Sequence, residues 1–285
     1  MDDRRFRRRL RGFAVLAVLL VVVVGGIAVA VTYLTQNQTL VRERCTAVVG
    51  PESYELDPDQ AANAALIAGL SVKRGLPPRA ASIALATAIQ ESKLRNIDYG
   101  DRDSVGLFQQ RPSQGWGTTE QLMDPVYATN AFYDVLVEIE GYENLAVTDA
   151  AQQVQRSAFP AAYADHEAEA RAFASALTGQ STGALNCVLR QPTTVGDPQQ
   201  VLGQLTTAFG EHSTSVSGRQ VLVQAQGSTG WAIAQWAVAN AKALNITGVD
   251  YAGLKWSREQ AQWSVAETTS DTVRITLAGP DDIKE

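Results

Sequence analysis

The residue best suited to acid–base chemistry is Glu91, which follows a nearly unbroken apolar stretch from Ala80 to Ile89. Such a stretch predicts a helix that is buried on most sides. A carboxylate at the end of a buried helix is poorly solvated, so we expect burial to raise the pKa of Glu91. A carboxyl group that keeps its proton near neutral pH can act as a general acid. The alternative is a Glu that simply reaches the surface and pairs with Arg95.

A polar, glycine-rich segment, residues 96–117, follows this helix and contains candidates for a binding groove. Its strand-like piece, residues 105–110, predicts a small hairpin facing the acid. Two adjacent glutamine amides there can bind hydroxyl or acetamido groups, and a glycine permits a tight turn and a close approach. A tryptophan offers an apolar face to a ring, or else covers the core. The candidate binding residues of this segment are Ser104, Gly106, Gln109, Gln110 and Trp116.

Three aspartates in the same segment, Asp98, Asp101 and Asp103, are candidates for a second carboxylate. Hydrolysis of a glycosidic bond with retention or inversion uses two acidic groups that flank the bond. Aspartates beside glycine also form ordinary turns through local hydrogen bonds to the backbone. Both interpretations stay open at this point.

Three short motifs occur in order along the chain: Glu91-Ser92, then S-V-G-L-F-Q over 104–109, then Q-R-S-A-F-P-A-A-Y over 155–163. Together they resemble the lysozyme-like lytic transglycosylases of bacterial cell walls, over about residues 57–178. The resemblance implies a mainly α-helical fold with a small β-hairpin. It also implies cleavage of the β-1,4 bond between N-acetylmuramic acid (MurNAc) and N-acetylglucosamine (GlcNAc) in peptidoglycan glycan strands.

The same resemblance implies roles for two residues and needs no cofactor. Glu91 acts first as the acid and then as the base, while the 6-hydroxyl of the muramic acid attacks and leaves a 1,6-anhydro sugar. Tyr163 forms a hydrogen bond near the scissile bond. The related goose-type lysozymes have loop aspartates in a comparable place, so a hydrolase is an alternative to a transglycosylase.

The chain departs from the common pattern of this family at two places. The family has a Tyr-Asn pair near its third motif, whereas Ala164 follows Tyr163 here. The aspartate-rich segment 98–103 replaces the Pro and Ser residues that are usual after the Glu-Ser pair. A non-catalytic peptidoglycan-binding or cell-envelope scaffold protein is therefore the alternative function.

The N-terminus predicts a membrane anchor. Residues 1–13 contain six Arg and two Asp, a balance of +4, and an apolar run of 21 residues from Ala14 to Leu34 follows. At about 1.5 Å per residue this run spans the roughly 30 Å of a bilayer core. The arginines favour a cytoplasmic N-terminus, with the main domains outside. A cleaved signal peptide is the alternative, because Ala28-Val29-Ala30 resembles a cleavage site.

Two cysteines, Cys45 and Cys187, bound the region between the anchor and the C-terminal part of the chain. In an exported protein such a pair is expected to form a disulfide. After Cys187 the pattern changes to alternating strands and helices, with strands expected over 220–225, 249–251 and 272–277, which predicts a separate α+β domain. The expected organisation is a basic tail over 1–13, a transmembrane helix over 14–34, a lysozyme-like domain over 45–187, a linker over 188–200 and an α+β domain over 201–279.

The composition excludes several other classes. The net charge is −6, so the chain after residue 13 carries −10, which disfavours nucleic-acid binding. Two His and two Cys give no metal-ligand spacing. The C-terminal domain contains four of the five tryptophans, which favour a packed core over a carbohydrate platform. This domain loosely resembles C-terminal domains of exported actinobacterial wall proteins, and an envelope protein is its candidate partner.

Overall fold

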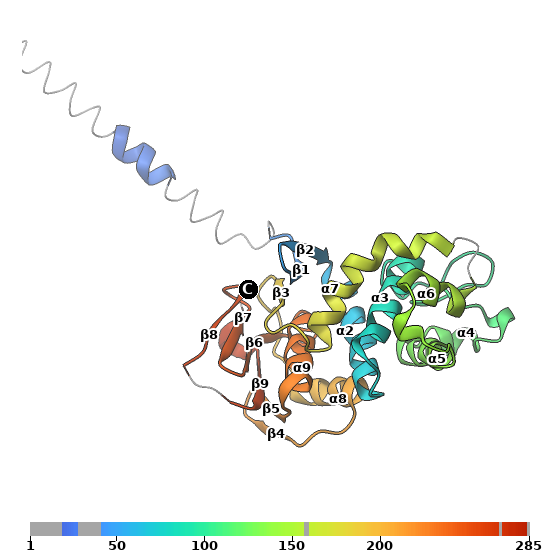
Figure 1. Cartoon of the computed structure of the whole chain (residues 1–285). Helices are drawn as coiled ribbons and strands as arrows, with labels where there is room; N and C mark the ends of the chain where they lie inside the picture. Colours follow the sequence, from blue (N-terminus) through green and yellow to red (C-terminus); the bar gives the residue numbers. More distant parts are fainter. Residues whose placement is uncertain (1–18, 28–40, 157–159, 268–269, 284–285) are drawn as a thin grey trace, which may run out of the picture. The chain divides into compact units, whose positions relative to one another are not determined.

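The structure, a computed structural model, describes residues 19–27, 41–156, 160–267 and 270–283 (Figure 1). The chain divides into two compact units, Met1–Arg42 and Glu43–Glu285. The second unit is an α+β structure with two antiparallel sheets.

In the first unit, residues 19–27 are helical. Among the residues that the structure describes, no helix combines the length and apolar character needed to cross a bilayer. The predicted basic tail lies outside the described residues, as do both ends of the predicted transmembrane helix, 14–18 and 28–34. The anchor therefore stays a prediction.

Proline sets the start of the main helices. In α2 (Pro58–Lys73), α3 (Pro78–Ser92) and α5 (Pro125–Val137) the first helical residue is proline, whose fixed φ suits that position. Helix α6 (Val147–Gln155) is capped by Ala146. The remaining helical elements of this region are η2 (Pro112–Gln114), α4 (Thr119–Leu122), η3 (Tyr142–Asn144), η4 (Pro160–His166) and α7 (Glu167–Leu177).

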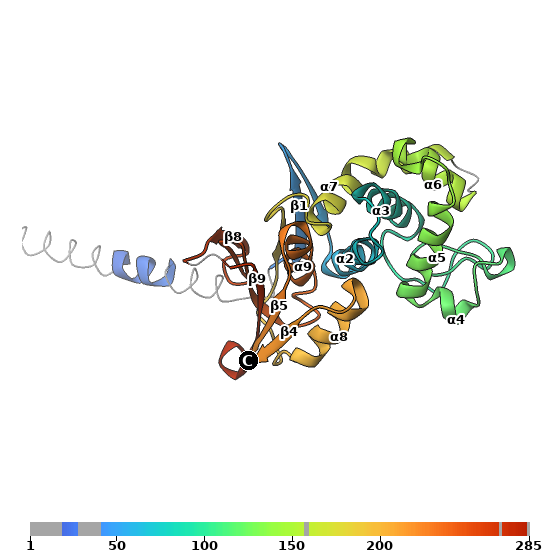
Figure 2. The same ribbon diagram turned by 60° about the horizontal axis from the view of Figure 1, so that its bottom comes forward.

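Helix α3 is the central helix of this region. Every residue from Ala80 to Ile89 is buried, as the apolar stretch predicts. The surrounding contacts come from α2, α5, α6, α7 and η4 (Figures 1 and 2). The helix ends at Ser92, because Lys93 adopts a left-handed conformation with φ 53°.

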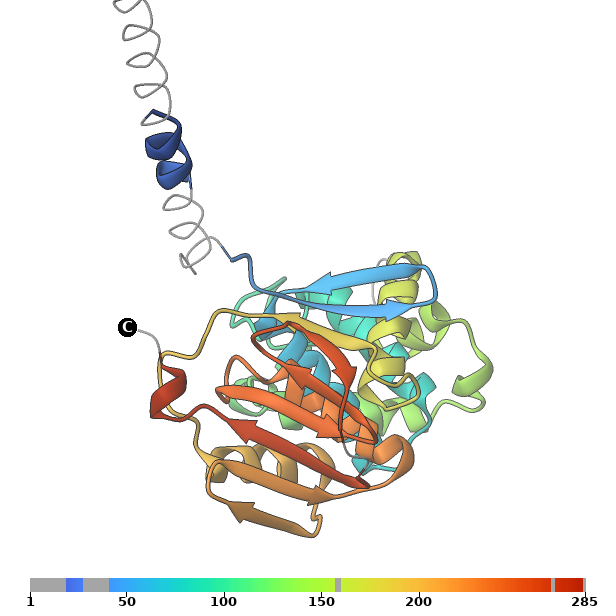
Figure 3. The same ribbon diagram turned by 90° about the vertical axis from the view of Figure 1, so that its left-hand side faces the viewer.

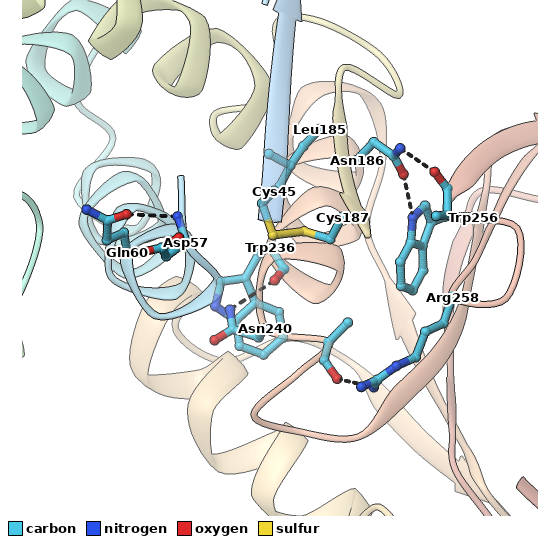
Figure 4. The surroundings of a disulfide bond; sticks show 12 residues. Cys45, Asp57, Gln60, Leu185, Asn186, Cys187, Trp236, Asn240, Trp256 and Arg258 are labelled. Atoms are coloured by element: carbon cyan, nitrogen blue, oxygen red, sulfur yellow. Dashed lines mark hydrogen bonds between the residues drawn. A yellow bond between two sulfur atoms is a disulfide. The ribbon is translucent and has the colours of Figure 1, made fainter. Parts of the chain in front are cut away.

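A small sheet links the two ends of the helical region. Strand β1 (Arg44–Val49) pairs with β2 (Glu52–Leu56) on one side and with β3 (Leu185–Val188) on the other. Cys45 and Cys187 lie opposite each other on β1 and β3 and form the predicted disulfide, which is thereby confirmed (Figure 4). The sequence analysis did not predict these three strands.

The second sheet has the strand order β4-β5-β9-β6-β7-β8 and is antiparallel throughout (Figure 3). The expected strands over 220–225, 249–251 and 272–277 appear as β5, β6 and β9. The strands are β4 (Thr214–Ser217), β5 (Gln220–Gln224), β6 (Ile246–Tyr251), β7 (Leu254–Ser257), β8 (Gln262–Val265) and β9 (Thr272–Leu277).

Helix α9 (Gly227–Ala239) joins the C-terminal part to the helical region. All of its residues from Gly230 to Ala239 are buried. One side of the helix contacts β6 and β9, and it also contacts α2 and α7 (Figure 2). Helix α8 (Pro198–Phe209) packs on α2 as well. The two domains predicted as separate therefore share one hydrophobic core within the second unit.

Gln235 of α9 is the polar contact at the centre of this shared core, and it is 0% exposed. Its Oε1 accepts hydrogen bonds from the backbone N–H groups of Ala184 and Leu185, both at 2.8 Å. Its Nε2 donates to the carbonyl oxygens of Ala176 at 2.6 Å and Ser181 at 2.8 Å. This one amide thereby satisfies four backbone groups between α7 and β3.

The tryptophans of the C-terminal part pack in the core, as the sequence favours. Trp236 is 2% exposed and Trp256 0%. The Trp256 Nε1 donates to the Asn186 Oδ1 at 2.9 Å, next to the disulfide (Figure 4). Trp256 therefore connects the large sheet to β3, whereas Trp236 packs edge-to-face on Phe209 of α8.

Replacing both cysteines, Cys45→Ala with Cys187→Ala, is expected to lower the free energy of unfolding by about 2–5 kcal/mol, because the bond closes a long loop in the unfolded chain. Urea unfolding followed by tryptophan fluorescence measures this change. Reduced wild-type protein serves as the control and should match the double variant. A double variant as stable as the oxidised wild type would contradict the expectation.

The substitution Gln235→Leu is expected to lower the free energy of unfolding by about 1–3 kcal/mol, because it removes a buried amide that hydrogen-bonds four backbone groups. Gln262→Leu on the exposed face of β8 is the matched control and should change stability little. Thermal unfolding of the two variants compares them directly. Equal effects of both substitutions would show that the hydrogen bonds of the Gln235 amide do not contribute to the free energy of unfolding.

Candidate active site around Glu91

The end of the buried helix α3 brings three polar side chains to one place. Gln90 is exposed, Glu91 is partly buried and Ser92 is buried. The middle of the helix, Ala80 to Ile89, is enclosed by other helices, and its C-terminal turn reaches toward solvent. The sequence therefore positions Glu91 through the burial of the residues before it.

The carboxyl group of Glu91 contacts two side chains from distant parts of the chain. The Tyr163 hydroxyl on η4 donates to the Glu91 Oε1 at 2.6 Å. The Gln155 side chain at the end of α6 also hydrogen-bonds this carboxylate. Burial raises the pKa of Glu91 and outweighs these two hydrogen bonds, which stabilise the charged form. The group therefore keeps its proton to higher pH than an ordinary Glu.

Two side chains next to this carboxyl hold the loop that follows α3. Ser92 Oγ donates to the carbonyl oxygen of Leu107 at 2.7 Å. Gln155 Nε2 donates to the next carbonyl, that of Phe108, also at 2.7 Å. Ser92 and Gln155, which both lie next to Glu91, thus hold two consecutive peptide groups of the loop.

The loop itself has little regular structure. The hairpin expected over 105–110 is reduced to one isolated antiparallel bridge between Val105 and Gln110. Residues 106–109 form a turn, and Leu107 and Phe108 within it are both 0% exposed. Packing of these two residues therefore takes the place of strand pairing.

Gly106 is required by the packing of this loop. Its φ is +79°, and its N–H donates to the carbonyl oxygen of Ile97 at 2.7 Å. A Cβ at this position would lie 2.3 Å from the backbone oxygen of Leu122. The group that closely approaches Gly106 is therefore the backbone of Leu122 and not a ligand.

Three other predicted binding residues lie in the same loop with different exposure. Ser104 is 7% exposed and Gln110 is 2% exposed, and the Gln110 Nε2 donates to the carbonyl oxygen of Ala128 at 3.3 Å. Gln110 therefore belongs to the packing between the loop and α5, and Ser104 is a second buried polar residue of the loop. Gln109 is partly buried, and its Nε2 lies 3.3 Å from the carbonyl oxygens of Tyr99 and Gly106.

The three candidate aspartates differ in their surroundings. Asp98 and Asp101 are exposed. Asp103 accepts hydrogen bonds from the Arg111 Nε at 2.8 Å and from the Ser113 N–H at 2.7 Å. These contacts, led by the Arg111 guanidinium, hold the pKa of Asp103 well below its usual range. Asp103 is therefore ionised, and its carboxylate is used in hydrogen bonds within the loop.

Trp116 lines a pocket of about 420 Å³ between the loop, α5 and α6. Its ring is partly buried against the core, and its backbone oxygen accepts a hydrogen bond from the Tyr127 hydroxyl at 3.1 Å. The other residues of the pocket are Gln114, Gly115, Val135, Val154, Gln155 and Arg156. Because Gln155 also contacts the Glu91 carboxylate, the pocket lies next to the acid.

Gln155 is the site residue that the sequence analysis did not assign. It is the first residue of the third motif, but its contacts to Glu91 and Phe108 join segments far apart in the chain. The signal available in the sequence was its place at the end of a helix next to that motif. In the described part of the chain, no group of three or more His, Cys, Asp or Glu side chains could hold a metal ion.

A scan against protein-family models and a search of curated proteins both gave no match to this chain. The resemblance to lytic transglycosylases thus depends on the residues and motifs themselves.

The substitution Tyr163→Phe is expected to raise the pKa of Glu91 further, because it removes a donor that stabilises the carboxylate. NMR titration of the Glu side-chain carboxyl carbons measures the pKa. Tyr142→Phe, which changes another largely buried tyrosine, is the control and should leave it unchanged. A pKa that stays the same or falls in Tyr163→Phe would contradict the role of this hydrogen bond.

Proposed function

We propose that the chain cleaves the β-1,4 bond between MurNAc and GlcNAc in peptidoglycan, with Glu91 as the general acid and base. The observation that carries the proposal is the state of the Glu91 carboxyl. It is partly dehydrated, its pKa is raised, and the Tyr163 hydroxyl orients it at 2.6 Å. A proton held in this way can be transferred to a glycosidic oxygen.

The lytic transglycosylase reaction fits these groups better than hydrolysis. Glu91 donates its proton to the bridging oxygen as the bond between that oxygen and the muramic C1 breaks. The 6-hydroxyl oxygen of the same sugar then bonds to C1, and its proton passes to the Glu91 carboxylate. This route needs one carboxyl group, whereas hydrolysis needs two that flank the bond. Asp103 is bound by Arg111 and Ser113, which argues against its use as the second one.

The location of the protein is part of the proposal. We infer that residues 14–34 anchor the chain in the cell membrane, with the N-terminus in the cytoplasm and Glu43–Glu285 outside. The arginine-rich tail before an apolar run supports this orientation. The disulfide between Cys45 and Cys187 is consistent with an oxidising compartment. Peptidoglycan is present on that side of the membrane.

The purified full chain is expected to release soluble fragments from cell-wall sacculi, and Glu91→Gln is expected to reduce the rate at least about 100-fold, because Gln cannot transfer a proton. Glu169→Gln is the matched control. Burial also raises the pKa of Glu169, but this residue lies on α7 and lines a different pocket, with Gln90 and His166. This control should keep the wild-type rate.

Mass spectrometry of the fragments distinguishes the reactions. We expect 1,6-anhydro ends, whereas reducing ends would identify a hydrolase. If the wild type binds sacculi but releases no fragments, the result would contradict the proposed enzyme activity and support a glycan-binding scaffold. Equal activity of wild type and Glu91→Gln would exclude Glu91 as the acid.

A further inference from the structure

The Trp116 pocket, defined by the seven residues given above, combines an apolar surface with a single cation. Trp116, Val135 and Val154 supply the apolar part, and Arg156 supplies the charge. Its volume of about 420 Å³ is within the range of small-ligand sites and suits one sugar ring with a substituent. A flat aromatic side chain beside aliphatic ones favours the apolar face of a ring.

Arg156 is placed at this pocket by the end of α6. It adopts a left-handed conformation with φ +50°, and its N–H donates to the carbonyl oxygen of Gln152 at 2.8 Å. Its side chain is exposed and has no hydrogen bond or ion pair with any other residue in the described part of the chain. In a chain with a net charge of −6, an unpaired guanidinium in a pocket is a specific feature that favours an anionic group.

Gln155 connects the pocket to the acid. It lines the pocket beside Arg156, and its side chain hydrogen-bonds the Glu91 carboxylate. Of the seven lining residues, Gln155 is the one that contacts Glu91, so the pocket and the acid share this side chain. The pocket thus has the position of a sugar site next to the bond that is cleaved.

We propose that this pocket binds a muramic acid unit through its free lactyl carboxylate, which pairs with Arg156 while the ring packs on Trp116. This inference deepens the proposed function and rests on it. The lactyl group is an ether substituent of the ring, so its carboxylate lies near the ring, as Arg156 lies near Trp116 in one pocket. In a strand that carries peptide stems, this carboxyl is a neutral amide. The pocket therefore binds strands without peptides more tightly, while strands with peptides still bind through the ring.

The test measures binding to the full chain in the Glu91→Gln background, which prevents cleavage, by isothermal titration calorimetry. The probes are a peptide-free tetrasaccharide of alternating GlcNAc and MurNAc, the same tetrasaccharide with peptide stems, and a GlcNAc tetrasaccharide. Arg156→Gln is expected to weaken binding of the peptide-free muramic probe about tenfold and to leave the GlcNAc probe unchanged.

Two variants control for charge and for folding. Arg274→Gln removes an exposed arginine from the large sheet and should leave all three affinities unchanged. Arg156→Asn removes the same charge as Arg156→Gln, and Asn tolerates the left-handed conformation at this position. It should therefore fold and should lose the same affinity.

Several outcomes would overturn the inference. These are an unchanged affinity in both Arg156 variants, an equal loss for the muramic and GlcNAc probes, and tighter binding of the peptide-bearing probe. If the wild-type chain releases fragments from sacculi but the binding measurements give any of these results, only the pocket inference fails. If the probe preference is found but wild-type chain releases nothing, the enzyme proposal fails and the binding site remains.

Discussion

The burial of helix α3 on every side is the constraint on which the site depends. Ala80 to Ile89 are small or aliphatic apart from Ser82 and Thr87, whose hydroxyls donate to the carbonyls of Pro78 and Ile83. Such a helix gains stability only when other helices surround it, and they then leave its last turn as the exit to solvent. A carboxylate in that turn is close enough to the core to lose part of its hydration and close enough to the surface to meet a ligand.

The position of the acid and the position of the loop depend on the same side chains. The segment 96–117 has only the bridge between Val105 and Gln110 as strand pairing in the described structure. Its peptide groups are instead held by Ser92 and Gln155, which flank the acid in sequence or contact it in space. This explains in physical terms why a Glu-Ser pair and a Gly-Leu-Phe-Gln piece occur together, since the hydroxyl next to the acid needs a carbonyl from the loop.

Features that depend on local chemistry could be predicted from the sequence, whereas features that depend on long-range contacts could not. Pro58, Pro78 and Pro125 each begin a helix, and such starts can be read from the sequence because proline restricts φ wherever it occurs. The disulfide followed from two cysteines in an exported chain. Strands β2, β4 and β8 gave no clear alternation, because their residues are mostly exposed. Strands β1 and β3 do alternate, but they are only six and four residues long and pair across the whole helical region. Gln155 and Gln235 were not found, because their partners lie far away in sequence.

The electrostatics around Glu91 argue for chemistry with one carboxyl group. An ionised neighbour of like charge would raise the pKa of Glu91 by repulsion, as in paired-carboxylate sites. Burial is instead the cause that raises this pKa, and the groups that contact the carboxyl are the neutral side chains of Tyr163 and Gln155. The nearest candidate in sequence with a fixed position, Asp103, has its charge balanced by Arg111. A reaction in which the substrate supplies its own nucleophile fits such a site, because the protein then has only one proton to hold and return.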